Sequence, residues 1–189
     1  MLFIQIKTVI TIGIIIFLAA GFFFAITVRI SDPTSSYEIA AHERGASYSG
    51  TERVVMQDKT NACGPAALKM ILDAHGKKAQ LAELERGDDT IRSGWSMQSL
   101  KEIAERYGLQ AEGWRLDLDA LCRCRFPVIL FVENRHFVVV DGGDTSGFFY
   151  VRDPAIGRMK IHRRALAKIW TGETLVFGGN QSLCEINPK

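Results

Sequence analysis

The chain has 189 residues, of which 47% are hydrophobic and 23% are charged, and its formal net charge at pH 7 is +2. This length accommodates one membrane-spanning segment and one domain with a hydrophobic core, but not two full domains. The near balance of 23 Lys and Arg against 21 Asp and Glu argues against a nucleic-acid partner, which a strongly basic surface would attract.

An uncharged apolar segment lies near the amino terminus, over residues 8–28 between Lys7 and Arg29. At about 1.5 Å per residue, a helix of this length spans the roughly 30 Å of a bilayer core. A cleavable signal peptide is the alternative, but its apolar region is normally shorter, and residues 22–26 offer no small-residue cleavage site. We therefore expect a membrane protein whose parts are a short tail over 1–7, an uncleaved transmembrane anchor over 8–28, a polar tether over 29–52 and one domain over 53–189.

The side of the membrane on which the domain lies is weakly specified. Lys7 and the amino terminus on one side of the anchor nearly balance Arg29 and Arg44 on the other. Because short N-terminal tails commonly stay inside while the following domain crosses, we expect an outward-facing domain.

Within the domain, helical patterns come first and strand patterns follow. Apolar residues recur at helical spacing early in the domain, and from residue 111 onward short apolar runs bounded by Gly and Pro indicate strands. This order predicts an α+β domain in which N-terminal helices pack on an antiparallel sheet. The expected helices cover residues 64–75, 79–85, 97–107, 118–123 and 163–170, and the expected strands cover 111–116, 127–132, 136–140, 148–151 and 174–177.

A cysteine stands at the start of the first of these helices. Ala67, Leu68 and Ile71 lie at helical spacing after Cys63, and Pro65 is tolerated in a first helical turn. The unpaired N–H groups and the positive dipole end of a helix N-terminus favour a thiolate. The alternative for an isolated cysteine is a small buried hydrophobe.

A histidine and an aspartate lie in the two strands of a predicted hairpin. If residues 143–146 form the turn, Gly142 pairs with Gly147, and His136 directly faces Asp153. A carboxylate across the ladder would fix the imidazole tautomer and leave the other ring nitrogen for Cys63. A slip by one residue would turn His136 away. Asn134 is a competing orienting residue, and an ordinary turn is the alternative for Asp153-Pro154.

Gln57 ends an apolar run six residues before Cys63. Its amide could join the Cys63 backbone N–H in stabilising a tetrahedral oxyanion, although an exposed glutamine is equally compatible with the spacing.

We expect no metal site at the remaining cysteines. Cys122 and Cys124 form a bare C-x-C pair without the further ligands of a zinc site, and a bridge from Cys184 to either of them stays open. No metal or nucleotide cofactor is implied.

Four ordered blocks resemble the bacteriocin-processing, double-glycine leader peptidases, which are cysteine-peptidase family thirty-nine and have a papain-like fold. The resemblance covers roughly residues 53–178. The blocks are Gln57-x5-Cys63-Gly-Pro-Ala-Ala-Leu-x-Met-Ile, His136-Phe-Val-Val-Val, Val151-Arg-Asp153-Pro-Ala-x-Gly and Trp170-Thr-Gly.

The resemblance implies Cys63 as nucleophile, His136 as base, Asp153 as orienting residue and Gln57 as oxyanion donor. It implies cleavage of peptide substrates through an acyl-enzyme, often after Gly-Gly in a leader peptide. The best-known members are fused to an exporter and ATPase, whereas this sequence has no G-x-x-x-x-G-K-[ST] phosphate loop, so any exporter is expected to be a separate chain. Two alternatives stay open: an amidase or acyl transferase with the same triad, and a non-catalytic peptide-binding module for a transporter.

Overall fold

The computed structural model describes residues 33–86 and 95–178. The chain divides into two compact units, residues 1–39 and 40–189. The expected anchor over residues 8–28 lies outside the described residues. Within those that are described, no helix is both long enough and apolar enough to cross a bilayer.

The second unit is built on a sheet that has seven strands within the described residues, in the order β1-β6-β5-β4-β3-β7-β2. Every pair of neighbouring strands is antiparallel. The strands are β1 (Ala46–Tyr48), β2 (Ala111–Arg115), β3 (Val128–Val132), β4 (His136–Gly143), β5 (Phe148–Asp153), β6 (Gly157–His162) and β7 (Trp170–Phe177).

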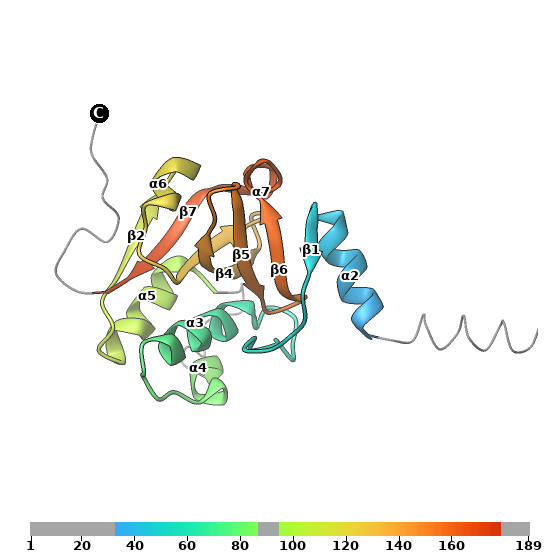
Figure 1. Ribbon diagram of the computed structural model, residues 1–189. Coiled ribbons are helices and arrows are strands. Elements are labelled where there is room, and N and C mark those ends of the chain that lie inside the picture. The colour runs from blue at the N-terminus through green and yellow to red at the C-terminus, as the bar shows by residue number, and fades with distance from the viewer. Residues whose placement is uncertain (1–32, 87–94, 179–189) are drawn as a thin grey trace, which may run out of the picture. The chain divides into compact units, whose positions relative to one another are not determined.

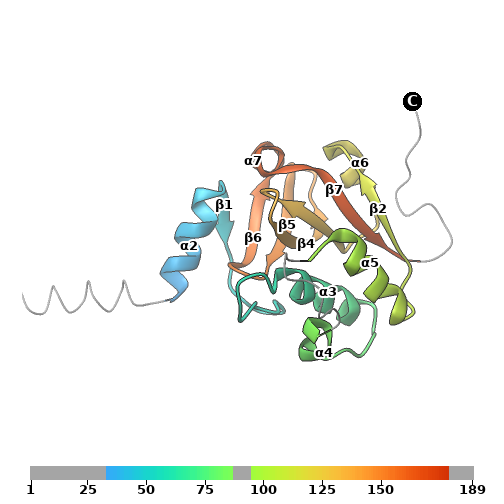
Figure 2. The same ribbon diagram turned by 180° about the vertical axis from the view of Figure 1, so that it is seen from behind.

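Three helices gather on one side of this sheet, where the first and third pack on the strands and the second packs on the first, as the views from front and back both show (Figures 1 and 2). They are α3 (Cys63–Ala74), α4 (Leu81–Arg86) and α5 (Met97–Arg106), while α6 (Leu118–Cys122) and α7 (Arg163–Ile169) lie at the opposite end of the strands. Leu68, Ile71 and Leu72 of α3 are fully buried and share one core cluster with Ile129 of β3 and Val139 of β4. The apolar face of α3 therefore fixes the helix that begins at Cys63 against the central strands.

The predicted α+β architecture is confirmed, and the helix at Cys63 begins where the pattern placed it, to within one residue. Ser96 caps α5, as its position before an apolar stripe predicted, by accepting a hydrogen bond from the Ser99 N–H at 3.0 Å.

Three features differ from the prediction. The expected polar tether contains helix α2 (Pro33–Glu43) and strand β1, which pairs with β6. Strand β6 itself was not predicted, although Met159 and Ile161 are buried and alternate with less buried polar residues, as in a strand with one face toward the core. Strand β7 begins at Trp170, four residues before the expected strand.

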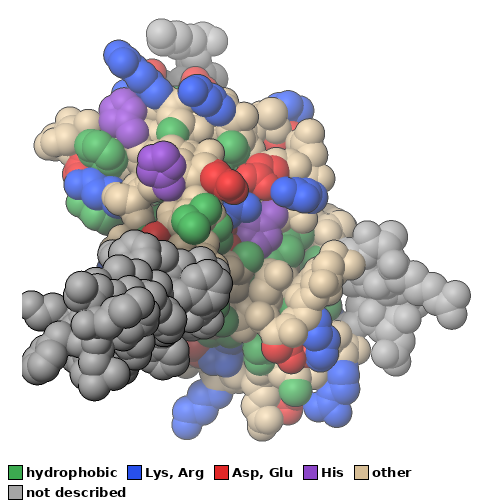
Figure 3. All heavy atoms as spheres, turned by 90° about the vertical axis from the view of Figure 1, so that its right-hand side faces the viewer, with side chains coloured by type: hydrophobic (Ala, Val, Ile, Leu, Met, Phe, Trp, Pro, Cys, Tyr) green, Lys and Arg blue, Asp and Glu red, His purple; other side chains and the backbone are tan. Residues whose placement is uncertain are grey.

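The described surface shows no single-sign charge field on the face drawn in Figure 3. Basic and acidic side chains are interspersed there. This distribution agrees with the near-neutral composition of the whole chain.

Candidate active site

Cys63 occupies the first position of α3 and is only 6% exposed. The preceding residue, Ala62, provides no side-chain cap, so the first N–H groups of the helix are left available to the thiol. The glycine that follows is required by packing, because a Cβ at Gly64 would lie 2.8 Å from the Trp95 Cβ. The Cys-Gly pair thus lets a tryptophan close over the first helical turn.

His136 forms a hydrogen bond with the Cys63 thiol from the first position of β4. Burial raises the pKa of Cys63, but hydrogen bonds to the thiolate from His136 and from the N–H groups of Phe137 and Gly64 outweigh it, so the pKa is lowered. Burial in turn lowers the pKa of His136, but hydrogen bonds to Asp153 and Cys63 raise it to about 9. Both shifts favour a thiolate–imidazolium pair near neutral pH.

Asp153 is the group that orients the imidazole. Its Oδ1 lies 2.8 Å from the His136 Nε2, which leaves Nδ1 as the ring nitrogen for Cys63. Asp153 has no exposed surface, and His136 is 7% exposed. Asn134, the competing orienting residue, lies in the turn between β3 and β4 and is exposed. Cys63, His136 and Asp153 are therefore connected in that order by hydrogen bonds, as the predicted constellation required.

The predicted hairpin register is nevertheless wrong by two residues. Val139 faces Arg152 and Val140 faces Val151, so Asp153 falls opposite Val138 and not opposite His136. The turn lies further along the chain than expected, at residues 144–147, and a bulge adds one residue to β4 at Asp141. The combined displacement is an even number of residues, which keeps His136 and Asp153 on one face, where they meet diagonally.

The turn after β5 holds Asp153 in place. The Ala155 N–H donates to Asp153 Oδ1 at 2.7 Å, and the Ile156 N–H donates to the Asp153 carbonyl at 3.2 Å. Gly157 closes this turn with a φ of +115°, and a Cβ there would meet the Gly50 carbonyl oxygen at 2.6 Å. The glycine of the Asp-Pro-Ala-x-Gly block is thus required by both its backbone conformation and its neighbour.

Two charged residues to which the sequence analysis assigned no role in the site, Arg44 and Glu133, form an ion pair beside Asp153. Arg44 Nη1 donates to Asp153 Oδ2 at 2.7 Å, and the same guanidinium contacts Glu133 through Nε at 2.7 Å and Nη2 at 3.3 Å. Burial lowers the pKa of Arg44, but the bonds to Glu133 and Asp153 raise it overall. Arg44 lies in the interval expected to be a tether, and no local pattern marks it.

Gln57 lies beside this turn, because its N–H donates to the Pro154 carbonyl at 2.9 Å. Its side-chain Oε1 is buried and has no hydrogen-bond partner among the described residues. Its role as an oxyanion donor stays a prediction.

The other cysteines differ from one another. Cys122 carries a free, exposed thiol, Cys124 is disulfide-bonded, and Cys184 lies outside the described residues.

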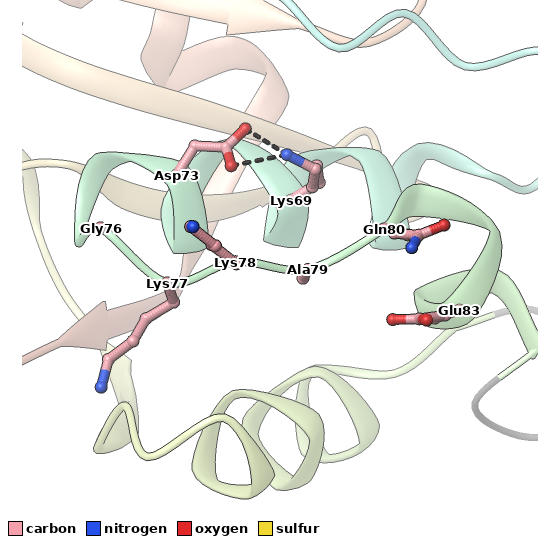
Figure 4. Close-up of a pocket in the computed structure, with 8 residues that line it drawn as sticks. All are labelled: Lys69, Asp73, Gly76, Lys77, Lys78, Ala79, Gln80 and Glu83. Carbon is pink, nitrogen blue, oxygen red and sulfur yellow. Dashed lines mark hydrogen bonds and ion pairs between the residues drawn. The ribbon is translucent and has the colours of Figure 1, made fainter.

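A cavity of about 610 Å³ lies at the opposite end of α3, between that helix and α4 (Figure 4). Lys69 and Asp73 form an ion pair on one wall, and Gln80 and Glu83 lie on the other. None of the residues that contact the Cys63 thiol lines it. This cavity is therefore separate from the candidate active site.

Comparison with known proteins decides the family. Residues 51–182 match the Peptidase C39 family. The chain belongs to this family. It carries a cysteine peptidase domain with the papain-like fold.

Relatives and solved structures agree with this assignment. An uncharacterized protein of Methanothermobacter marburgensis is 35% identical over 69% of this chain and 91% of its own length. The probable microcin-H47 secretion/processing ATP-binding protein MchF of Escherichia coli is 32% identical over 70% of this chain, but over only 19% of its own length. The probable functional amyloid protease FapD of Pseudomonas fluorescens is 30% identical over 62% of this chain and 57% of its own length.

Among solved structures, a double glycine motif protease from an AMS/PCAT transporter, in complex with its leader peptide, has a TM-score of 0.63 and 31% identity. The match covers 67% of this chain and 91% of that one. The peptidase domain of Streptococcus ComA matches with a TM-score of 0.62 at 21% identity over 67% of this chain and 98% of its own length, which shows the shared fold.

Proposed function

We propose that this C39 domain is a membrane-anchored peptidase that cleaves after Gly-Gly in the leader segments of exported peptides or proteins, through an acyl-enzyme on Cys63. The observation that carries the proposal is the hydrogen-bonded series from the Cys63 thiol through His136 to Asp153 at the N-terminus of α3. Its position inside the family match supports a hydrolytic role over a non-catalytic binding module.

In the proposed reaction, the Cys63 thiolate attacks the peptide carbonyl carbon and forms a tetrahedral intermediate. The His136 imidazolium then gives its proton to the leaving amine as the C–N bond breaks, which leaves a thioester on Cys63. Neutral His136 takes a proton from water, the resulting hydroxide attacks the thioester, and Cys63 leaves as a thiolate. Asp153 keeps the ring in the tautomer that serves both steps.

Oxyanion stabilisation is assigned to the Gln57 amide together with the Cys63 backbone N–H. One observation supports Gln57 in this role: its main chain is bonded to the turn that follows Asp153, which places the residue beside the site.

Similarity to the leader-peptide complex, at 31% identity, supports a Gly-Gly leader as substrate. The name of MchF, a secretion/processing ATP-binding protein, supports an exporter as the partner. The substrate would then be a precursor whose leader is removed in connection with its export.

The test uses the full chain in detergent with a peptide that contains a Gly-Gly leader junction, and mass spectrometry to locate the cut. Cys63→Ala should abolish cleavage, whereas Cys122→Ala should leave it unchanged because that exposed thiol lies outside the site. A peptide with Gly-Gly replaced by bulky residues should resist cleavage. Retained cleavage by Cys63→Ala would end the acyl-enzyme proposal, and cleavage of both peptides alike would end the Gly-Gly assignment.

The anchor over residues 8–28 and an outward-facing domain are part of the proposal. The disulfide-bonded state of Cys124 supports this side, since disulfides persist mainly outside the reducing cytosol. Cys122 provides the assay, because a membrane-impermeant maleimide should label it in intact cells if the domain faces outward. Cys122→Ser is the control for labelling at other thiols. Labelling that appears only after lysis would place the domain inside.

A further inference from the structure

Arg44 contacts the candidate active site from outside the segment that defines the family. The family match begins at residue 51, and Arg44 follows the end of α2, seven residues earlier. Its Nη1 lies 2.7 Å from Asp153 Oδ2, across 109 positions of sequence. After Gly45 the chain forms β1, an edge strand of the sheet, and its pairing with β6 fixes the direction in which the chain leaves Arg44.

The pair between Arg44 and Asp153 is shielded from water. The Asp153 side chain has no exposed surface, and that of Arg44 is 16% exposed. A cavity of only about 10 Å³ borders both residues, and its other walls are apolar side chains such as Val138, Val151 and Met159. A water molecule needs at least that much space and several polar partners, so solvent does not replace the guanidinium as the counter-charge of Asp153.

The two oxygens of the Asp153 carboxylate accept hydrogen bonds from different groups. Arg44 occupies Oδ2, whereas Oδ1 accepts from the His136 ring and the Ala155 N–H. With one oxygen held by a charged donor, the plane of the carboxylate is fixed and Oδ1 is directed at the imidazole.

The same guanidinium also holds the segment that leads into His136. Its Nε and Nη2 form a bidentate pair with Glu133, which has a φ of +54° in the turn between β3 and β4, three residues before His136. The Glu133 N–H donates to the Ile169 carbonyl at 2.7 Å, so this turn is itself fixed to α7. Arg44 therefore connects the end of β5, which carries the carboxylate, to the turn before β4, which carries the base.

We propose that Arg44 is a positioning residue for the peptidase, one that keeps the Asp153 carboxylate directed at His136, so that activity depends on the segment between the anchor and the family domain. This inference rests on the proposed cysteine-peptidase function. A lysine at position 44 would keep the charge but lose the planar fork that contacts both carboxylates at once.

The charged groups around this arrangement set the sign of its pH dependence. Asp153 faces Arg44 and His136, His136 also faces Cys63, and Glu133 faces Arg44 and Arg135. Without Arg44, Asp153 Oδ1 is no longer held toward the His136 ring, and a weaker hydrogen bond from the ring to the carboxylate stabilises the imidazolium less. The acidic limb of thiolate formation at Cys63 therefore moves to higher pH.

The experiment compares Arg44→Met, Arg44→Lys and Arg135→Met in the full chain with a Cys122→Ser background. Arg135→Met is the matched control, because Arg135 also contacts Glu133, at 3.2 Å, but is 78% exposed and makes no contact with Asp153. Two quantities are measured: kcat and KM on the Gly-Gly peptide, and the rate of Cys63 alkylation by iodoacetamide as a function of pH. Thermal melting of each variant corrects both for the folded fraction.

We expect Arg44→Met to lower kcat about 10- to 100-fold at little change in KM, the size of one charge-assisted hydrogen bond. Its acidic limb of alkylation should move up by about one pH unit or more. Arg44→Lys should recover part of both, and Arg135→Met should match the unaltered chain.

The proposal would be overturned if Arg44→Met had the same kcat and the same acidic limb of Cys63 alkylation as Arg135→Met. An acidic limb of Cys63 alkylation that moves to lower pH in Arg44→Met would also overturn it, since Arg44 would then act only by repelling the imidazolium. Failure of every chain to cleave a Gly-Gly peptide would count against the proposed function. The pH profile of Cys63 alkylation would still test the role of Arg44 in that case, because alkylation needs no peptide substrate.

Discussion

Replacement of Asp153 by asparagine tests the arrangement of the site most directly, because the amide keeps the shape of the carboxylate and removes its charge. In the structure, Oδ1 accepts from His136 and Ala155, and Oδ2 accepts from Arg44. An amide has one acceptor and one donor end. If its nitrogen faces Arg44, two donors oppose each other in a buried site; if its nitrogen faces His136, the ring must carry its proton on the side of Cys63 and loses its function as a base.

The size of the effect follows from the pKa of His136, which is raised from 6.5 to about 9. A difference of about 2.5 corresponds to roughly 3 kcal/mol of net imidazolium stabilisation, shared between Asp153 and Cys63. Loss of the Asp153 share alone costs on the order of tenfold, and adoption of the wrong tautomer costs up to about 10⁴-fold. We therefore expect Asp153→Asn to lower kcat/KM by about 10² to 10⁴.

The assay is cleavage of the Gly-Gly peptide by the full chain, together with alkylation of Cys63 in a Cys122→Ser background. Asp119→Asn is the matched control, since Asp119 also pairs with an arginine, Arg163, at 2.8 Å, but is 73% exposed. It should change nothing measurable. If Asp153→Asn keeps kcat/KM within about threefold of the control and its alkylation profile is unchanged, Asp153 does not orient His136 as argued.

Three further predictions concern other parts of the site. Because the pKa of His136 is raised to about 9, the ring stays protonated up to that pH, and kcat/KM should fall as the pH rises through it. The folding stability that this proton contributes is complete below pH 6.5 and is lost as the pH rises from 6.5 through about 9. If neither kcat/KM nor stability changed over this range, the raised pKa would be refuted. Gln57→Ala should lower kcat about 100- to 1,000-fold at similar KM, and an unchanged kcat would remove the residue from the oxyanion site. Gly157→Ala should lower the free energy of unfolding by about 1–3 kcal/mol in urea titrations, whereas Gly113→Ala, where a Cβ meets nothing within 4 Å, should not; equal effects would refute the steric argument.

The parts of the fold that could be predicted from the sequence are those governed by local patterns. The helix that starts at Cys63 and the capped helix after Ser96 follow from the spacing of apolar residues and from capping chemistry over a few positions. The hairpin spacing and the family blocks both pointed to Cys63, His136 and Asp153 as the predicted constellation, and the structure brings these three side chains together.

The parts that could not be predicted depend on contacts between distant segments. Strand β1 has three residues, too few for any periodic signal, and it exists because β6 provides a partner. Arg44 is one of many arginines in the sequence, and nothing local distinguishes it. Its importance arises from a buried carboxylate 109 positions away, which only the folded chain brings within 2.7 Å.

The hairpin shows how an error in strand register can leave the predicted proximity of two side chains intact. Close to the turn, the pairing of β4 with β5 differs from the predicted register by three residues, since Gly143 pairs with Phe149. An odd displacement alone would place His136 and Asp153 on opposite faces of the sheet. The bulge at Asp141 removes one residue from that displacement and restores the shared face. Because Arg152 holds the Asp141 carboxylate at 2.6 and 2.7 Å, the bulge is itself fixed by a bidentate pair. The geometry of the active site therefore depends on a bulged residue that takes no part in the chemistry.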